Sequence, residues 1–124
     1  MATTLVVDGA NVVGSRPDGW WKDRAGAARR LHEQLLVADL PYDDVVLVLE
    51  GAAKKGVRDG VDHDVRTVHA RRDGDSTIVA VTNQAIGEGE QVTVITADRV
   101  LRGAVENLGA RAMSPSWLLD QLEG

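Results

Sequence analysis

The sequence contains no cysteine and no phenylalanine, and aromatic residues make up only 3% of its 124 residues. The absence of cysteine excludes disulfide bonds, cysteine metal ligands and thiol nucleophiles. Because aromatic side chains are scarce, we expect a core built from Val, Leu, Ile and Ala. Basic residues are not in excess either, since the net charge is −5. This balance argues against a protein that simply coats nucleic acid with a basic surface. It does not argue against an enzyme whose carboxylates bind a metal ion.

Long apolar runs are also missing from the sequence. No stretch approaches the length that spans a membrane, and the N-terminus lacks a basic region followed by an apolar one. We therefore expect a soluble, cytoplasmic protein. A chain of this length with 44% hydrophobic residues can bury one sizeable core, so we predict a single domain over residues 1–124.

Strand-like and helix-like segments alternate along the chain. Strands are predicted at 3–8, 44–51, 65–70, 91–98 and 110–114. Helices are predicted at 23–40, 75–89 and 98–110, and from Ser114 onward. The second and fourth strands are almost entirely apolar, which is typical of parallel strands buried on both faces. The alternation predicts an α/β three-layer sandwich with a central parallel sheet of about five strands.

Two segments have neither a helical nor a strand period. Residues 14–23 contain proline, glycine and two tryptophans and are interpreted as a loop. Residues 51–64 contain three glycines and mixed charge, and we expect them to form a mobile flap. His63 lies in this flap, where we consider a minor contact with substrate. His32 is expected on the polar side of the first long helix.

Acidic residues recur where the predicted strands end. Asp8 and Glu50 directly follow two strands, Asp98 follows a third, and Asp73 and Asp75 open the helix at 75–89. Singly, these residues have ordinary structural roles, since Asp75 and Asp98 are good helix N-caps. Together, however, the carboxylates meet at one edge of a parallel sheet, where ligands bind in such folds. Their mutual repulsion favours a divalent cation with oxygen ligands, such as Mg²⁺ or Mn²⁺.

Four motifs in order resemble those of the PIN-like nuclease superfamily, and most closely its NYN branch. They are the stretches VVDGANVVG (6–14), VVLVLEG (45–51), DGDSTI (73–78) and VITADRVLR (94–102). The resemblance implies a PIN-like parallel sheet with an acidic pocket at the strand ends. It also implies a divalent-metal-dependent endoribonuclease that hydrolyses phosphodiester bonds of RNA, with single-stranded or loop regions as the expected substrate.

The resemblance also implies roles for individual residues. Asp8, Asp75 and Asp98 fall on the acidic metal-binding positions of the family. Asn11 falls on the polar position beside the first acid, and Thr96 on the hydroxyl position before the last. All five are therefore candidate catalytic residues.

Two positions depart from the family pattern. Glu50 stands where an aspartate is usual, so it is a candidate metal ligand that acts through water. Ser76 stands where some relatives carry a second aspartate, which leaves the site one carboxylate poorer. These departures keep open an alternative in which the domain binds RNA or a protein partner without cleaving.

Basic and aromatic side chains near the acidic edge are candidates for holding RNA phosphates and bases. They are Lys54, Lys55, Arg58, Arg71, Arg72, Arg99, Arg16 and Trp20. Trp20 and Trp21 are adjacent, so one is expected to be exposed and able to stack on a base. Trp117 is expected in the core.

Two further alternatives were weighed against the sequence. A receiver-type regulatory module needs an acidic pair after its first strand and a lysine after its last, and neither is present. A toxin neutralised by an antitoxin partner stays open, because a sequence cannot show what its neighbour is.

Overall fold

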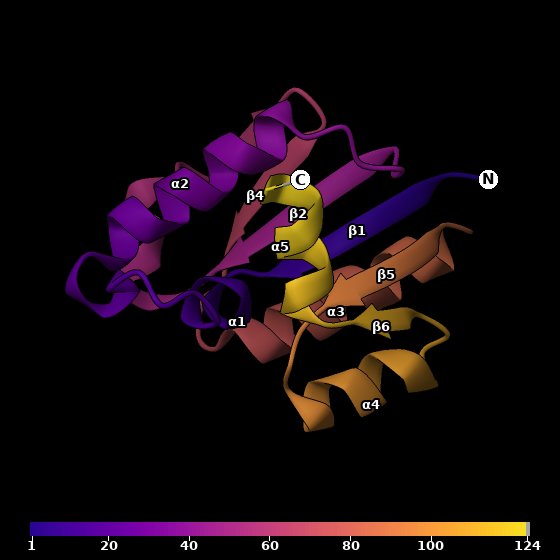
Figure 1. Cartoon of the computed structure of the whole chain (residues 1–124). Helices are drawn as coiled ribbons and strands as arrows, with labels where there is room; N and C mark the ends of the chain where they lie inside the picture. The colour runs from indigo at the N-terminus through magenta and orange to yellow at the C-terminus, as the bar shows by residue number, and fades with distance from the viewer. Residues whose placement is uncertain (124) are drawn as a thin grey trace.

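Six strands form one sheet in the order β3-β4-β2-β1-β5-β6, and the computed structural model describes residues 1–123 (Figure 1). The strands are β1 (Thr3–Asp8), β2 (Asp44–Leu49), β3 (Gly60–Asp62), β4 (Val65–His69), β5 (Gln91–Ile95) and β6 (Arg111–Met113). All neighbouring strands pair in parallel except β3, which runs antiparallel to β4. The central strands β1 and β2 are each buried at five of six residues, as expected for strands covered on both faces.

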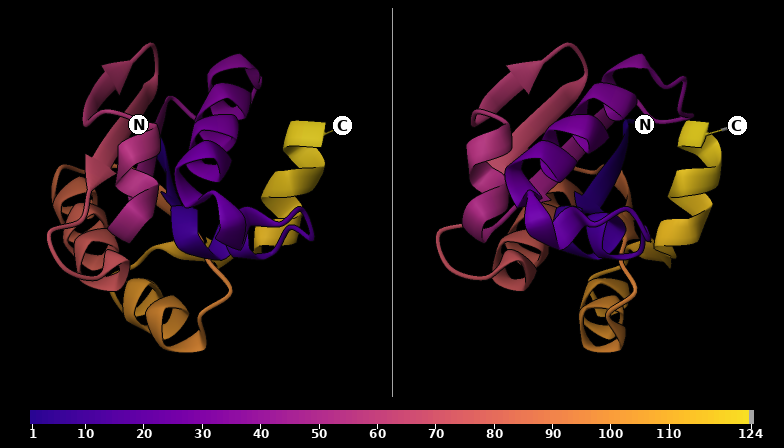
Figure 2. Two further views of the ribbon diagram at one scale, coloured as in Figure 1. Left: turned by 90° about the vertical axis from the view of Figure 1, so that its left-hand side faces the viewer. Right: turned by 60° about the vertical axis from the view of Figure 1, so that its left-hand side comes forward.

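Helices cover both faces of this sheet, so the protein has three layers (Figure 2). The helices are α1 (Gly9–Gly14), α2 (Arg24–Val37), α3 (Gly74–Gly87), α4 (Arg99–Asn107) and α5 (Pro115–Glu123), with short 3₁₀ helices η1 (Trp20–Lys22) and η2 (Gly51–Gly56). One face packs against α1, α2 and α5, and the other against α3 and α4. Within residues 1–123, no helix is both long and apolar enough to cross a membrane.

The alternation of side chains along the strands decides which groups reach each face. In β1, Leu5 and Val7 belong to the core under α1 and α2, whereas Val6 belongs to the core under α3 and α4. Because successive side chains point to opposite faces, Asp8 follows Val6 toward α3. The same alternation sends Glu50, at the end of β2, to that face.

The predicted parallel sheet is confirmed, but one prediction about its edge is wrong. Residues 51–64 were expected to lack regular structure, whereas they contain η2 and β3. The β3 strand pairs with β4, and the backbone N–H of His69 donates to the Asp59 carboxylate. Val57 is buried in the core beneath α2. A three-residue strand that begins at a glycine is too short to give a sequence period, which is why it was missed.

His32 is also placed differently from the prediction. It was expected on the polar side of α2, but it is 8% exposed, and its Nε2 lies 3.4 Å from the Asp62 carboxylate in β3. The β3–β4 hairpin folds back over α2 and covers a face that would otherwise meet solvent. A helical wheel alone cannot reveal a cover that comes from elsewhere in the chain.

Gly56 gives a stability prediction for the packing of η2 against α2. A Cβ at this position would lie 2.0 Å from the backbone carbonyl oxygen of Ala25, so η2 packs directly on the first turn of α2. We expect Gly56→Ala to lower the free energy of unfolding by about 1–3 kcal/mol, because a backbone oxygen cannot rotate away. Urea unfolding measures it, with Gly87→Ala as the matched control, since nothing lies within 4 Å of a Cβ there. Equal effects of the two substitutions would contradict this packing.

Candidate active site

Asp8 is both a helix cap and a member of the acidic edge. It ends β1 and is the N-cap of α1, where its Oδ1 accepts from the Asn11 backbone N–H at 3.3 Å. The Asn11 side-chain amide donates to its other oxygen, Oδ2, at 2.8 Å. Asp8 is only 3% exposed. The polar position predicted beside the first acid therefore fixes the orientation of that acid.

Thr96 joins two of the strand ends. Its hydroxyl donates to Asp8 Oδ2 at 2.8 Å and accepts from the backbone N–H of Asp98 at 3.2 Å. Thr96 is 1% exposed, and its hydrogen bond to Asp8 is buried, whereas the one from Asp98 is partly buried. Asp98 in turn is the N-cap of α4, where its Oδ1 accepts from the N–H groups of Val100 and Leu101. One hydroxyl thus sets the relative positions of Asp8 and the start of α4.

Two more carboxylates of this edge, Asp75 and Glu50, lie at the start of α3 and at the end of β2. Asp75 was considered as the N-cap of this helix, but the cap is Asp73, whose Oδ1 accepts from the Ser76 N–H at 2.7 Å. Asp75 therefore sits in the first helical turn, with its carboxylate not used as a cap. Glu50 accepts from the Gly74 backbone N–H at 2.8 Å and so ties β2 to the helix.

The charges of these groups act on one another. Burial raises the pKa of Asp8, and the nearby charge of Glu50 raises it further, while hydrogen bonds from Thr96 and Asn11 oppose the shift. The pKa of Asp75 is also raised, first by burial and then by the charges of Asp98 and Asp8. Four carboxyl groups at this edge are therefore close enough to repel one another.

This donor set fits a hard divalent cation. Mg²⁺ takes one or two direct carboxylates and keeps several water ligands, whereas a fully preformed cage is not its usual site. Within residues 1–123, no three His, Asp or Glu side chains converge as ready-made ligands. The residues at this edge thus suit an ion that is partly held by water.

The predicted RNA-contacting residues divide into those near the acidic edge and those turned away from it. Arg71 and Arg72 are exposed in the loop between β4 and α3, and Arg99 is exposed at the start of α4. Lys54 is nearby but is partly engaged, because its ammonium group donates to the carbonyl oxygen of Ala70 at 3.0 Å. Lys55, beside it in η2, is exposed.

Two predicted contacts point elsewhere. The Arg58 guanidinium donates to Asp62 in the β3–β4 hairpin. The Arg16 guanidinium donates to the side chain of Gln34, and Arg16 lines a separate hollow with Arg30. These two side chains are engaged by acceptors on the protein itself.

Trp20 is half-buried in η1, and Trp21 is 57% exposed. Their rings meet edge to face with centroids 5.9 Å apart. The Arg24 guanidinium lies over the Trp20 ring, 5.3 Å from its centroid. This contact was not predicted, although the spacing of four between Trp20 and Arg24 at the entry to α2 is a usable signal. Trp117 packs against the core, as predicted, with its ring edge-on to Tyr42.

A hollow of about 370 Å³ lies beside the acidic group. It is lined by Gly9, Ala10, Val13, Trp20, Arg24, Glu50, Gly51, Ala53 and Arg72. Gly9 is required by packing, since a Cβ there would lie 2.6 Å from the Val48 carbonyl oxygen. Ala10 is exposed, and its small side chain leaves the backbone open to approach.

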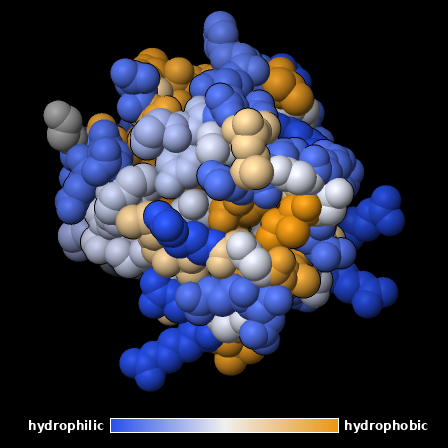
Figure 3. Space-filling view, turned by 90° about the vertical axis from the view of Figure 1, so that its right-hand side faces the viewer, coloured by the Kyte–Doolittle hydropathy of each residue, from blue (hydrophilic) through white to orange (hydrophobic). Residues whose placement is uncertain are grey.

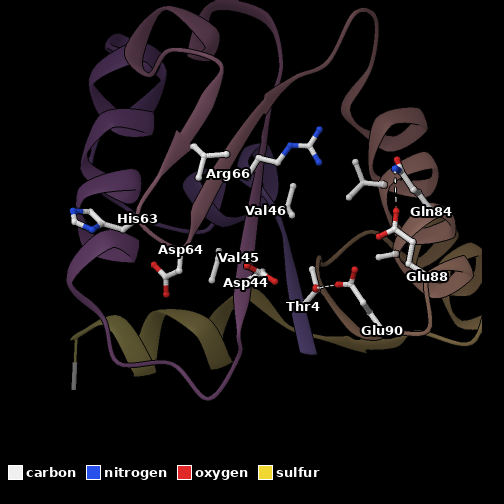
Figure 4. Close-up of a pocket in the computed structure, with 13 residues that line it drawn as sticks. Thr4, Asp44, Val45, Val46, His63, Asp64, Arg66, Gln84, Glu88 and Glu90 are labelled. Atoms are coloured by element: carbon white, nitrogen blue, oxygen red, sulfur yellow. Dashed lines mark hydrogen bonds between the residues drawn. The ribbon is translucent and has the colours of Figure 1, made fainter. Parts of the chain in front are cut away.

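A second hollow, of about 210 Å³, lies at the opposite edge, where the strands begin (Figure 4). His63 and Asp64 stand at the turn before β4, across from Glu88 and Glu90. Figure 3 shows this side, with apolar surface among charged side chains. His63, for which a minor contact with substrate was considered, lies at the edge remote from Asp8, because the antiparallel β3 carries this turn there.

Comparisons with known proteins agree with the fold described above. The crystal structure of Rae1 (YacP) from Bacillus subtilis is similar, with 22% identity and a TM-score of 0.78 over 99% of this chain and 74% of that one. A tryptophan-to-leucine mutant of Rae1 gives 20% identity and a TM-score of 0.79 over 98% and 75%. At these identities the likeness is one of fold. No curated protein matches the chain. Residues 5–124 match the YacP-like NYN domain family. The chain therefore belongs to the YacP-like NYN domain family, which is a family of nuclease type.

Proposed function

We propose that this protein is a divalent-metal-dependent endoribonuclease. The observation that carries the proposal is the linkage of the strand ends through Thr96, which holds Asp8 beside the start of α4. Glu50 and Asp75 add their charges at the same edge, as the raised pKa of Asp75 indicates. Such a group of carboxylates is costly without a cation, so a built-in function is the physical reason for it.

The proposed ligands are Asp8, Asp75 and Asp98, with Glu50 acting through water. Mg²⁺ or Mn²⁺ bound there supplies an acidified water and offsets negative charge on the phosphate. Asn11 and Thr96 keep the Asp8 carboxylate in one orientation. The exposed Arg71, Arg72, Arg99 and Lys55 are proposed to bind RNA phosphates and so bring the strand to this edge.

A non-cleaving domain that binds RNA or a protein partner is the second candidate. It is favoured by the lack, within residues 1–123, of three converging ligand side chains. It is also favoured by the hydrogen bond that commits one Glu50 oxygen to Gly74.

An RNA-cleavage panel separates the two candidates. End-labelled single-stranded RNA, duplex RNA and single-stranded DNA are incubated with Mg²⁺, Mn²⁺, Ca²⁺ or chelator. We expect internal cuts in single-stranded RNA with Mg²⁺ or Mn²⁺ and none with chelator. RNA binding without cuts in any metal would contradict the nuclease and support the binding domain.

The exposed arginines beside the acidic edge give a prediction about how RNA binding depends on salt concentration. Replacing Arg71 and Arg72 together by alanine should weaken binding of single-stranded RNA and flatten its dependence on salt. The slope of log K against log[salt] is expected to fall by about 0.7 for each phosphate that the variant no longer neutralises. Fluorescence anisotropy at salt concentrations from about 50 to 200 mM measures this slope. Arg66→Ala is the matched control, because Arg66 lines the hollow at the opposite edge. An unchanged slope in the double variant would exclude these arginines from the RNA path.

A further inference from the structure

The hollow beside the acidic group differs from the others in what forms its walls. It combines an indole ring, alanine and valine side chains, and the backbone of two glycines, with charged groups only at Arg24, Glu50 and Arg72. A volume of about 370 Å³ lies at the small end of ligand pockets, which suits one flat group rather than an extended one. Its apolar lining with a few polar groups is typical of ligand sites.

The aromatic wall of this hollow is held in place from two directions. Trp20 packs against the core beneath α1 and α2, and Gly14 leaves room beside its ring, since a Cβ on Gly14 would be 3.8 Å from Trp20 Cζ2. The Arg24 guanidinium lies over the ring on the side of α2. A wall fixed in this way loses little conformational entropy when a planar ligand stacks on it. Indole rings and guanidinium planes are the surfaces on which proteins stack unpaired bases.

The position of the hollow links it to the acids. Glu50 lines the hollow and lies two residues after Val48, which pairs with Asp8 between β2 and β1. Gly9 and Ala10, which line the hollow, directly follow Asp8 in the chain. Gly51 has φ +56, so the chain turns at once after Glu50 and leaves the entrance open. A group in the hollow is therefore a neighbour of any phosphate held at the acidic edge.

The charges at the entrance also suit a nucleotide. Arg72 lines this hollow and also a third hollow, which runs along α3 and is lined by Arg71 as well. An arginine between two hollows can bind the phosphate that joins two nucleotides. The same arrangement would not suit an apolar peptide side chain, which brings no charge for Arg72.

We propose that this hollow, walled by Trp20 and Arg24, binds one unpaired base of the RNA strand next to the cleaved phosphate. The inference rests on the proposed function for the identity of the strand, and it adds a subsite that selects single-stranded RNA. A base inside a duplex must leave its stack before it enters such a pocket. Paired RNA is therefore excluded by the base pocket and not only by the acids.

The test changes the RNA and leaves the protein intact. A labelled single-stranded RNA is compared with versions that each lack one base, with the abasic nucleotide moved along the strand. We expect loss of one base, at a fixed distance from the cut, to reduce cleavage by roughly tenfold or more. Binding in chelator, measured by anisotropy, should weaken at the same position. No loss at any abasic position, while cleavage continues, would overturn the pocket and leave the nuclease standing.

Protein variants identify the pocket itself. Trp20→Ala should reproduce the loss on intact RNA and add little on the RNA that lacks the critical base. Trp21→Ala is the matched control, because Trp21 is exposed and does not line the hollow. If Trp20→Ala fails to fold, Arg24→Ala replaces it, since Arg24 is exposed at the start of α2. A Trp21→Ala loss equal to that of Trp20→Ala would overturn the assignment. If no RNA is cut but one abasic position weakens binding, the pocket stands and the nuclease does not.

Discussion

Asp8→Asn is expected to reduce RNA cleavage by roughly 100-fold or more. The reason is that Asp8 is the most buried carboxylate of the site and supplies charge for a cation at this edge. Partners one step removed from a metal are already worth roughly 10- to 100-fold, so a direct ligand is expected to matter more. The rate at saturating RNA with Mg²⁺ measures the effect. Equal cleavage by the wild type and the variant would assign the activity to a contaminant.

The same substitution should leave the fold intact and change its dependence on pH. Burial raises the Asp8 pKa, so the folded state holds a proton that the unfolded chain loses at about pH 3.9. Without metal, the free energy of unfolding should therefore fall as pH rises from that value through the raised folded pKa. Asp8→Asn should remove the part of this fall that comes from Asp8, while Asp75, whose pKa is also raised, keeps its own part. Urea unfolding at about pH 3.5 and about pH 7 in chelator measures the difference, and an identical pH dependence in both proteins would contradict a destabilising Asp8 charge.

Thr96→Val is expected to reduce cleavage by roughly 10- to 100-fold although Thr96 need not touch the substrate. Valine has nearly the same shape, but it cannot donate to Asp8 or accept from the Asp98 N–H. The hydrogen bond from Thr96 opposes the rise in the Asp8 pKa, so its loss should raise that pKa further. Two buried groups also lose a partner, which should cost about 1–3 kcal/mol of unfolding free energy.

Thr96→Ser separates positioning from packing. Serine keeps the hydroxyl and loses only a methyl group, so most of the activity should return. Titration of each variant with Mn²⁺ measures its metal affinity. We expect weaker manganese binding in Thr96→Val and recovered binding in Thr96→Ser. If the serine and valine variants lose activity and manganese affinity equally, the hydroxyl has no part in holding Asp8.

Much of the fold was predictable because its signals are local. The runs of valine in β2 and β5 mark strands covered on both faces, and the apolar period of α2 marks a helix on one of them. The parallel arrangement then brings Asp8, Glu50 and Asp98 to one edge. The features that escaped prediction depend on contacts distant in sequence. His32 is buried only because the β3–β4 hairpin returns over α2.

At the acidic edge, the sequence favoured the wrong cap for α3. Asp75 was considered as its N-cap, but the cap is Asp73, so a difference of two residues decides which carboxylate is used by the helix. Asp73 takes the cap, with hydrogen bonds from the Ser76 backbone and side chain that lower its pKa. Ser76, which stands in place of a second aspartate, is thus engaged in the cap. The contact between Trp20 and Arg24 was not predicted either, although their spacing of four at the entry to α2 offered a signal for it.

The antiparallel β3 strand has a consequence for how this protein stays apart from copies of itself. Without it, β4 would end the sheet, and its free N–H and C=O groups beside buried Val65 and Thr67 would form a template for another chain. β3 instead offers an outer rim of three residues, and its Asp62 is bound by Arg58 and faces His32. A short, charged rim is a poor template for strand addition. The β3–β4 hairpin therefore protects the side of the sheet from strand addition, away from the carboxyl ends where the acids lie. Substitutions that disrupt the hairpin should first cause self-association.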